Sequence, residues 1–592
     1  MPTADGAIRV ANCSGFYGDR LAAAREQVEG GDIDYLTGDW LAELTMLILA
    51  RTRAGGRSGG WARTFLTQLE QVMGTCLDKG IRVVSNAGGL DPAGCAAAVT
   101  ELAGKLGLAP RIAYVAGDDL MGRLDELTAA GVAFTNLDTG ESLTDLGVEV
   151  ITANAYLGCW GIVDALGRGA DIVVTGRTTD AAIVMGPPAH AFGWRRDDWD
   201  RLAGACVAGH VIECGAQATG GNYSFFTEVP GMDYAGFPIA ELYADGSSVI
   251  TKHAGTGGQV SIGTVTSQLL YEISSERYAN PDVVCRFDTI HLEELAVDRV
   301  RISGTRGEPA PPTLKVAMNY QGGFRNGFTF ALTGLDIEEK AALLTRQMWS
   351  AFPGGPDYFD QARVQLIRTD HADPQSNEAA TAMLKITVKD RDERKVGRAF
   401  ANQAVEFGLA SIPGFYGLSG APGPGTPYGV YWPALIPSGL APQEVVLLGG
   451  ERTVVDNTPP GMAGAEVVVP AVELPASPGG ETARVPLGTL FGARSGDKGG
   501  NANVGLFARS AAAYVWLEQF LTVERLAELL PDTAGLEIRR YRLPNIWSLN
   551  FVVVGFLEEG VAASSRQDGQ AKSLGEYVRA KCADIPEALL GA

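Results

Sequence analysis

The stretch Asp171-Ile172-Val173-Val174-Thr175-Gly176-Arg177-Thr178-Thr179-Asp180 contains the pattern that decides the fold. A short run of β-branched residues, typical of a strand, breaks into glycine and small polar residues. Four more runs between residues 8 and 187 break in the same way, and amphipathic stretches between the runs predict helices. The other runs are 8–11, 81–84, 111–115 and 148–151, and the helical stretches are 64–77, 92–106 and 119–129.

The alternation of strands and helices predicts a doubly wound α/β lobe with a mainly parallel sheet over residues 6–190. Ligands of such sheets bind beyond the carboxyl ends of the strands. We therefore expect the five breaks to surround one crevice and to bind a substrate there. The candidates in these breaks are Ser14, Asn86, Gly88, Gly89, Thr178 and Asp180.

The rest of the chain divides into three parts by composition. Residues 191–452 mix helical patterns with strand-like alternation, which predicts an α+β second lobe of the same main body. Residues 453–483 are rich in proline and glycine, as is typical of a linker. Residues 484–585 follow the order strand, glycine loop, strand, helix, two strands and helix, which predicts a small α+β domain.

The net charge of the chain argues against nucleic acid as a partner. Its 592 residues include 69 acidic and 48 basic side chains, which gives a formal net charge of −21. Because sequence-independent binding to nucleic acid depends on clustered Lys and Arg, we expect no nucleic-acid partner. No apolar run reaches the roughly 18 residues of a membrane span, and residues 1–8 do not resemble a secretory leader. We expect a cytoplasmic protein without a membrane partner, with most of its eight scattered cysteines reduced.

The common cofactor signatures are missing from the sequence. It has no GxGxxG after a strand, no GxxxxGK[ST] and no HExxH, so we predict no cofactor and no metal. A divalent metal remains an alternative, because Cys206, His210 and Cys214 are spaced by four and would share one face of a helix. The other interpretation of these residues is a buried helix packed by small apolar thiols.

His210 and Glu213 are the candidates for catalysis. They lie one helical turn apart, directly before a glycine-rich turn. Imidazole titrates near neutral pH and a neighbouring carboxylate tunes it, so the pair could act as a general acid and base. The alternative is a hydrogen bond at the end of a helix.

Two glycine-rich turns offer further candidates for substrate binding. The first directly follows Glu213, and the second precedes a plausible helix over 260–273. If the second turn lies at the start of that helix, its free amides would receive an anion. The alternative is a close-packed turn between a strand and a helix. The candidates in the two turns are Gln217, Gly220, Gly221, Asn222, Gly257 and Gly258.

The loop over 493–503 combines cations, glycines and small polar residues. The cations supply positive charge, the glycines let backbone amides approach a ligand, and the polar side chains can orient it. This composition suits a carboxylate or a phosphate. The alternative is an ordinary hairpin turn with an internal Arg–Asp pair. The candidates are Arg494, Ser495, Asp497, Lys498 and Asn503.

Four long strings of the sequence are distinctive: Asn12-Cys13-Ser14-Gly15-Phe16-Tyr17-Gly18-Asp19-Arg20, Ser85-Asn86-Ala87-Gly88-Gly89-Leu90, Gly209-His210-Val211-Ile212-Glu213-Cys214-Gly215-Ala216-Gln217, and Gly257-Gly258 before Gln268-Leu269-Leu270-Tyr271-Glu272. These strings resemble the acyclic terpene utilisation (AtuA-like) family, and the loop at 493–505 is similar to the ferredoxin-like domain appended to that family. The resemblance covers about 6–450 and 484–585. It implies a role like that of family members, which are associated with bacterial breakdown of citronellol and geraniol through branched acyl-CoA thioesters.

Together these features predict an enzyme of acyl-CoA or carboxylic-acid catabolism. We expect a lyase or hydratase whose substrate is a branched or dicarboxylic acyl-CoA, a small anionic molecule. His210 or Glu213 would move protons, and the loop from Arg494 to Asn503 would bind a carboxylate or a CoA phosphate. The alternative is a non-catalytic subunit that binds acyl-CoA in a degradative complex. The chain could also form a homo-oligomer.

Overall fold

The computed structural model describes residues 6–56, 59–418, 423–458, 464 and 466–591. The chain forms two compact units. The large unit comprises Met1–Asn319, Tyr431–Val561 and Gln570–Ala592, and the small unit comprises Tyr320–Val430 and Ala562–Gly569. The candidate residues named above all lie in the large unit.

The large unit is built on one mixed sheet. Its strands have the order β11-β12-β8-β7-β1-β2-β3-β6-β4-β19-β20. The central strands β1, β2, β3, β6 and β4 are parallel, as the alternating pattern predicts. The bounds are β1 (Ile8–Asn12), β2 (Tyr35–Gly38), β3 (Arg82–Ser85), β4 (Ile112–Ala116), β6 (Ile172–Thr175), β7 (Pro238–Leu242), β8 (Ser248–Lys252), β11 (His291–Ala296), β12 (Arg299–Ser303), β19 (Gln443–Leu447) and β20 (Arg452–Val455).

The prediction of a mainly parallel sheet is wrong for the sheet as a whole. The strands β7, β8, β12 and β11 extend one edge with antiparallel pairs, and β19 with β20 extends the other edge in the same way. Strands joined by short connections pair antiparallel, whereas parallel pairs need long crossovers. Since these added strands come from beyond residue 190, the sheet crosses the predicted boundary between the lobes.

The fifth predicted strand belongs to another sheet. β5 (Val150–Ala155) pairs with β14 (Thr313–Thr333) and not with the central parallel strands. The place expected for it in the parallel group is taken by β2, which lies between β1 and β3 and was not predicted. Strand propensity indicates that a segment is extended, but packing chooses its partner.

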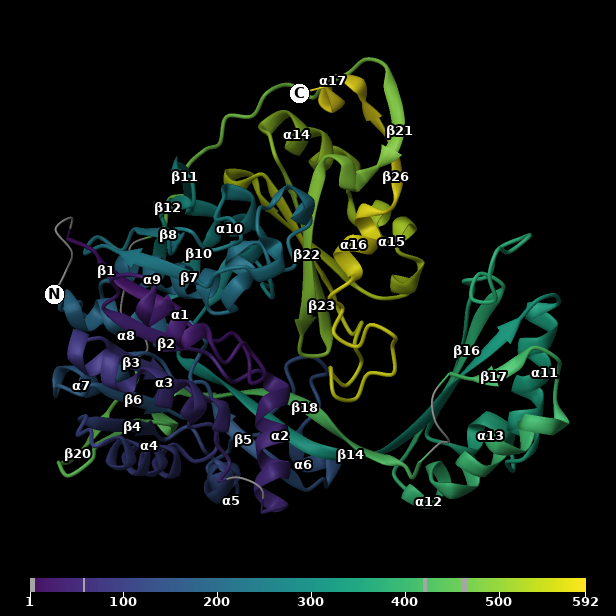
Figure 1. Ribbon diagram of the computed structural model, residues 1–592, viewed down its shortest axis with the longest axis horizontal. Helices are drawn as coiled ribbons and strands as arrows, with labels where there is room; N and C mark the ends of the chain where they lie inside the picture. Colours follow the sequence, from purple (N-terminus) through teal and green to yellow (C-terminus); the bar gives the residue numbers. More distant parts are fainter. Residues whose placement is uncertain (1–5, 57–58, 419–422, 459–463, 465, 592) are drawn as a thin grey trace. The chain divides into compact units, whose positions relative to one another are not determined.

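Helices cover both faces of the large sheet. On one face α1 (Ala23–Glu29), α3 (Arg63–Lys79) and α4 (Pro92–Leu106) share a core with the alternate strand residues Val83 and Ile172. On the other face α7 (Trp160–Gly167), α8 (Ala182–Ala191) and α9 (Trp199–Ile212) pack against Val84 and Val173. Figure 1 shows α3 and α4 beside β3, β6 and β4. The remaining helices of this part are α2 (Glu43–Ala54), α5 (Leu124–Ala129), α6 (Leu143–Leu146) and α10 (Ile262–Leu269), and a small sheet joins β9 (Arg277–Ala279), β10 (Val284–Arg286) and β13 (Arg306–Glu308).

Local sequence explains why α4 has the predicted bounds. The Asp91 side chain accepts a hydrogen bond from the Gly94 amide, and Pro92 occupies the first helical position, where its missing N–H costs nothing. Gly107 ends the helix in the left-handed conformation, with φ of 70°.

The C-terminal part of the large unit is a compact α+β domain. Its four-stranded sheet has the order β22-β23-β25-β24, and its own core includes Phe491, Tyr514 and Phe551. Phe507, on β23, contributes instead to the core around α9. The elements are β21 (Thr482–Pro486), β22 (Phe491–Lys498), β23 (Asn501–Ala508), α14 (Ala511–Phe520), α15 (Val523–Leu529), β24 (Ile538–Leu543), β25 (Ser548–Val553), α16 (Leu574–Arg579), β26 (Cys582–Pro586) and α17 (Glu587–Leu590).

The small unit has its own antiparallel sheet and core. The sheet has the order β15-β16-β14-β17, and β18 also pairs with β14. A cluster of aromatic rings fills the core, including Phe328 and Phe400, whose ring centroids are 4.5 Å apart. The elements are β15 (Gln361–Ile367), β16 (Thr381–Asp390), β17 (Phe415–Gly417), β18 (Thr426–Pro437), α11 (Ile337–Ser350), α12 (Glu393–Val396) and α13 (Arg398–Ala410).

The segment predicted as a linker, 453–483, begins within β20 and ends within β21. Residues 459–463 and 465, which include Pro459-Pro460-Gly461, lie outside the described residues. None of the described helices has the length and apolar character that crossing a membrane requires. All eight cysteines are free thiols.

Candidate active site

The carboxyl ends of the central strands lie close to one another and to the end of α9. The Asn12 side chain donates to the backbone oxygens of Ile212 and Glu213, at 2.5 and 2.9 Å. In the next breaks Asn86 donates to Asp39 at 2.5 Å, and Asn154 donates to Asp118 at 2.8 Å. The structure therefore brings together the breaks that the sequence singled out, and it joins them to the His210–Glu213 pair.

His210 lies in the last turn of α9 with only 2% of its surface exposed. It packs between the rings of Tyr278 and Phe287, at centroid distances of 5.1 and 5.7 Å. Neither ring nitrogen has a hydrogen-bond partner among the described residues. Its Nδ1 lies 3.4 Å from Oε1 of Glu213. Burial, together with the Lys498 charge, lowers the pKa of His210 to about 4, so the imidazole is neutral near pH 7.

The pKa of Glu213 is shifted in the opposite direction from that of His210. Its pKa lies well above the usual value because the side chain is buried and because Asp180 and Glu272 add negative charge nearby. Its Oε2 has no hydrogen-bond partner within the described part of the chain. The raised pKa favours the protonated carboxyl, which is a proton donor beside a neutral imidazole.

The loop after β6 places a buried cation at the edge of this group. Arg177 is 2% exposed, pairs with Asp180 at 2.9 Å, and lies over the Tyr156 ring at 4.1 Å. It also donates to the Leu41 backbone oxygen. The Arg177 amide donates to Asp118 at 2.9 Å, which fixes the loop. Beside it, the buried Thr178 hydroxyl has no hydrogen-bond partner among the described residues.

A hairpin of the C-terminal domain brings Asp497 and Lys498 to the same place. The hairpin joins β22 and β23, and Lys498 pairs with Asn501 across its turn. The Lys498 ammonium lies 5.6 Å from the centroid of Tyr278, the ring that also packs on His210. The pKa of Lys498 is lowered, first by burial and then by the charge of Lys315. Burial and the charges of Glu272 and Glu43 raise the pKa of Asp497 to about 8.

The hairpin docks on the end of α10. The Glu272 amide donates to Oδ1 of Asn503 at 2.8 Å, and Asn503 in turn donates to Asn550. Gly496 lies against Tyr271, since a Cβ atom there would be 2.6 Å from the ring. These contacts fix the distance between the hairpin and the body, so Asn503 positions the hairpin and is not free to bind a ligand.

Lys315 and Glu43 complete the charged group and were not predicted. They form an ion pair at 2.8 Å. The Lys315 ammonium lies 5.1 Å from the Tyr156 centroid and 5.4 Å from the Tyr431 centroid. Both residues come from segments without a motif, and only the alternation of residues 313–319 indicated which face Lys315 would occupy.

Several other predicted binding residues have partners within the protein. Arg494 donates to Gln217 and lies 4.1 Å from the Tyr271 centroid, so the alternative of an internal Arg494–Asp497 pair is wrong. The Ser495 hydroxyl accepts a hydrogen bond from the Gly575 amide at 2.9 Å. These residues join the C-terminal domain to the body and to its own helix α16.

The glycine turns are close-packed. Helix α10 begins at Ile262 behind Ser261, so the expected place of Gly257 and Gly258 at a helix start is wrong. The Gly258 amide donates to Pro230 at 2.8 Å and is not available to an anion. A β-branched Val260 and the capping hydroxyl of Ser261 shift the helix start past the glycines.

The remaining candidates are also explained by turns and packing. The Ser14 hydroxyl donates to the Phe16 oxygen at 3.1 Å. A Cβ atom on Gly88 would lie 2.5 Å from the Thr175 oxygen, and Gly89 has φ of 51°. Gly220 is left-handed with φ of 117°, and the turn continues through Gly221 to the exposed Asn222.

The helix residues considered for zinc are arranged for packing. Cys206 lies beside Cys285 in the core, and Cys214 follows the end of α9. Among the described residues, no three His, Cys, Asp or Glu side chains are arranged to hold a metal ion.

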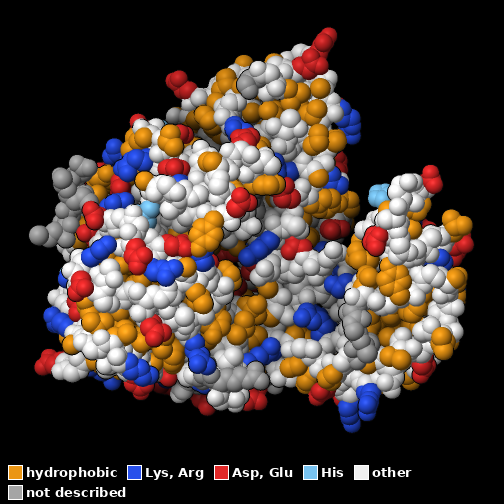
Figure 2. All heavy atoms as spheres, in the orientation of Figure 1, with side chains coloured by type: hydrophobic (Ala, Val, Ile, Leu, Met, Phe, Trp, Pro, Cys, Tyr) orange, Lys and Arg blue, Asp and Glu red, His pale blue; other side chains and the backbone are white. Residues whose placement is uncertain are grey.

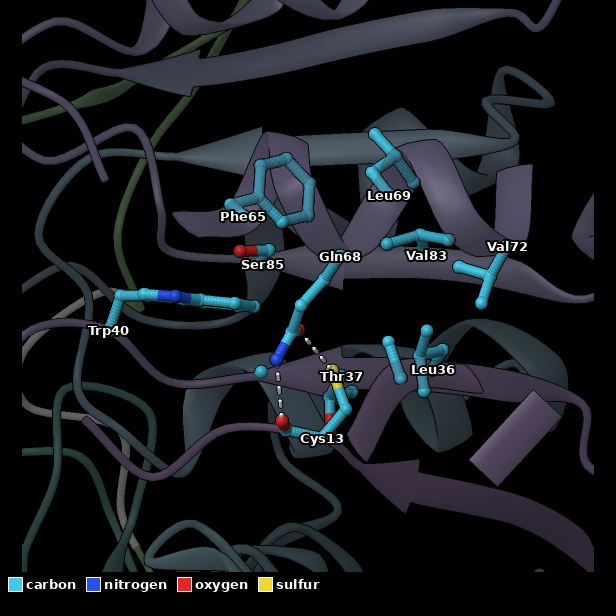
Figure 3. Close-up of a pocket in the computed structure, with 12 residues that line it drawn as sticks. Cys13, Leu36, Thr37, Trp40, Phe65, Gln68, Leu69, Val72, Val83 and Ser85 are labelled. Atoms are coloured by element: carbon cyan, nitrogen blue, oxygen red, sulfur yellow. Dashed lines mark hydrogen bonds between the residues drawn. The ribbon is translucent and has the colours of Figure 1, made fainter. Parts of the chain in front are cut away.

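A separate cavity lies under the parallel strands. Figure 3 shows its walls, which include Trp40, Phe65 and Val72, and Gln68, which donates to the Cys13 oxygen at 3.2 Å. The lining is almost wholly apolar, so this cavity is a packing feature rather than part of the charged group. On the face in Figure 2, Lys and Arg side chains are interspersed with acidic ones and form no broad basic patch.

Comparison with known proteins agrees with the resemblance in the sequence. The family described as acyclic terpene utilisation family protein AtuA matches residues 8–447, and the AtuA ferredoxin-like domain matches residues 485–582. No curated protein and no solved structure matches the chain. The family match covers well over half of the sequence and both predicted parts. The chain therefore belongs to the acyclic terpene utilisation family AtuA and carries the ferredoxin-like domain of that family.

Proposed function

We propose that the chain is an enzyme of acyl-CoA or carboxylic-acid catabolism, a lyase or hydratase that moves a proton next to a carbonyl group. One observation carries this proposal. An amine with a lowered pKa, Lys498, lies in one buried charged group, named the recess below, with carboxyl groups of raised pKa, Glu213 and Asp497. Titratable groups whose pKa values are pushed apart mark the acid and the base of an active site.

The chemistry follows from these protonation states. The neutral fraction of Lys498 accepts the proton from the carbon next to the carbonyl, and protonated Glu213 or Asp497 donates to the oxygen that develops charge. His210, with a pKa of about 4, is a poor base for this step. Its place beside Glu213 suits it to orient that carboxyl. This assignment changes the predicted role of His210 and keeps that of Glu213.

The charge balance of the recess supports an anionic substrate. Burial raises the pKa of Asp39, Glu213, Glu272 and Asp497, so their neutral forms are favoured. Arg177 and Lys315 keep their charges because acidic neighbours and tyrosines outweigh the effect of burial. A substrate carboxylate could therefore join the ion pairs of these two cations, and the neutral carboxyl groups around it would repel it little.

The name of the family, acyclic terpene utilisation, supports a role in catabolism. Breakdown of branched terpenoid acids through thioesters requires hydration and carbon–carbon cleavage next to a thioester carbonyl. A branched or dicarboxylic acyl-CoA supplies both the carbonyl and the anionic group that the recess suits.

The experiment incubates the pure protein in D2O with a panel of branched and dicarboxylic acyl-CoA thioesters and their free acids. Mass spectrometry then measures products and deuterium incorporation. We expect conversion or exchange that falls about 10²-fold or more in Glu213→Gln. Asp119→Asn, an exposed change outside the recess, is the matched control and should retain full activity. Thermal stabilisation by a thioester, with neither conversion nor exchange, would refute catalysis and establish a binding subunit.

A further inference from the structure

Lys498 differs from the other basic residues of the recess because its ammonium has no carboxylate at ion-pair distance among the described residues. Arg177 pairs with Asp180, and Lys315 pairs with Glu43. The Lys498 ammonium lies 5.6 Å from the centroid of the Tyr278 ring, and Glu272, Glu43 and Asp180 act on its charge only from a longer range. An amine that is buried beside an aromatic face and near another cation favours its neutral form, which reacts as a nucleophile.

The backbone around Lys498 is fixed on both sides of the turn. The Gly500 amide and the Asn501 side chain donate to the two carboxylate oxygens of Asp138, at 3.0 and 2.8 Å. The Leu557 amide donates to the Gly500 oxygen at 2.9 Å. Gly499 supplies the left-handed turn with φ of 63°. The hairpin therefore presents the amine from a rigid support, as a catalytic nucleophile requires.

Glu272 is the proton donor on the same face of the hairpin as the amine, whereas Asp497 precedes Lys498 on strand β22 and its side chain leaves the opposite face. Glu272 is held to the hairpin by the hydrogen bond from its amide to Asn503, and its charge acts on Lys498. A Cβ atom on Gly496 would be 3.4 Å from Cγ of Glu272, which places this carboxyl against the hairpin. Glu213 is more distant from Lys498: the ammonium lies over the Tyr278 ring, this ring packs on His210, and His210 lies beside Glu213.

We propose that Lys498 forms an imine with the ketone or aldehyde carbon of an oxo acid. The inference rests on the function proposed for the recess and adds a substrate class and a covalent step. The neutral amine attacks the carbonyl carbon, and the carbonyl oxygen gains a proton to give a carbinolamine. Protonated Glu272 then donates a proton to the hydroxyl group, which leaves as water, while the nitrogen electron pair forms the C=N bond. The Glu272 carboxylate that results can accept the proton from the adjacent carbon.

The test traps the imine on the full-length protein. Acetoacetate is added with sodium cyanoborohydride, which reduces the C=N bond to a stable amine, and tryptic peptides are mapped by mass spectrometry. We expect residues 495–509 as one peptide, uncleaved at Lys498 and heavier by the mass of acetoacetate less one oxygen atom. 3-Hydroxybutyrate, which lacks the carbonyl, should give no adduct.

Two variants make the assignment specific. Lys498→Arg keeps the cation but cannot form an imine, so the adduct should disappear. Lys581→Met removes a lysine of the same domain that lies over the Tyr577 ring, and the adduct should persist. An adduct on another lysine, or none on folded wild-type protein, overturns the inference. If the protein still exchanges deuterium into a substrate while no adduct forms, Lys498 acts only as a base and the proposed function stands.

Discussion

Asp118 provides a quantitative test of how the strand ends are held together. This residue is 2% exposed, and its Oδ2 accepts hydrogen bonds from the Asn154 side chain and the Arg177 amide, at 2.8 and 2.9 Å. Burial raises its pKa from 3.8 to about 7, against the effect of these hydrogen bonds. A tenfold change in proton affinity is worth about 1.4 kcal/mol. The raised pKa therefore corresponds to about 4 kcal/mol.

The sign follows from which state binds more protons. Between about pH 4 and pH 7 the folded state keeps Asp118 protonated, whereas the unfolded state releases the proton. The contribution of this residue is thus fully present below about pH 4 and is lost as the pH rises through about 7. In Asp118→Asn the side-chain oxygen can still accept both hydrogen bonds, but the group does not titrate.

The assay is urea unfolding of wild type and Asp118→Asn from pH 4 to pH 8, with Asp119→Asn as the exposed neighbouring control. Relative to wild type, Asp118→Asn should gain stability as the pH rises, by up to about 4 kcal/mol at pH 8. Asp119→Asn should shift the midpoint of the pH dependence only slightly, because Asp119 is a smaller cause of the raised pKa of Asp118 than burial. Identical pH dependence in wild type and Asp118→Asn would show that Asp118 is ionised in the folded protein, and the reasoning on buried carboxyls in this recess would fail with it.

Three more predictions concern the recess and the hairpin. If Asp497 acts as the acid, kcat/KM should fall above about pH 8, where this carboxyl loses its proton. Asp497→Asn should remove this decrease from the pH profile. A decrease that persists in the variant would assign it to another group. His210→Phe keeps an aromatic side chain but removes both ring nitrogens. Turnover measured with the thioester panel should fall about 10²-fold while the fold persists. Unchanged turnover would exclude a role for the nitrogens. Gly496→Ala presses on the Tyr271 ring and should cost about 1–3 kcal/mol in urea unfolding, whereas Gly479→Ala, in open space, should be neutral. Equal stability of the two variants would contradict the close docking of the hairpin.

Local sequence patterns were sufficient to predict many of the helices and strands. The run at 111–115 forms β4, the amphipathic stretch 92–106 forms α4, and a helix and a strand predicted in the C-terminal domain form α14 and β24. Each has β-branched periodicity, a capping residue or a glycine stop within a few positions of its end. Long strings of residues also sufficed to indicate the family.

The sequence by itself indicated four of the five parallel central strands, several of the helices around them, the glycine breaks, and the family to which the chain belongs. Only the tertiary structure decided that the sheet is mixed, that β5 pairs outside the parallel group, and that the charged group includes Glu43 and Lys315. The physical reason is the separation in sequence over which each interaction acts. Capping and periodicity act over a few residues, whereas Glu43 and Lys315 are 272 positions apart in sequence and meet only through packing. The pKa of a carboxyl such as Glu213 likewise depends on burial and on distant charges, which no local pattern encodes.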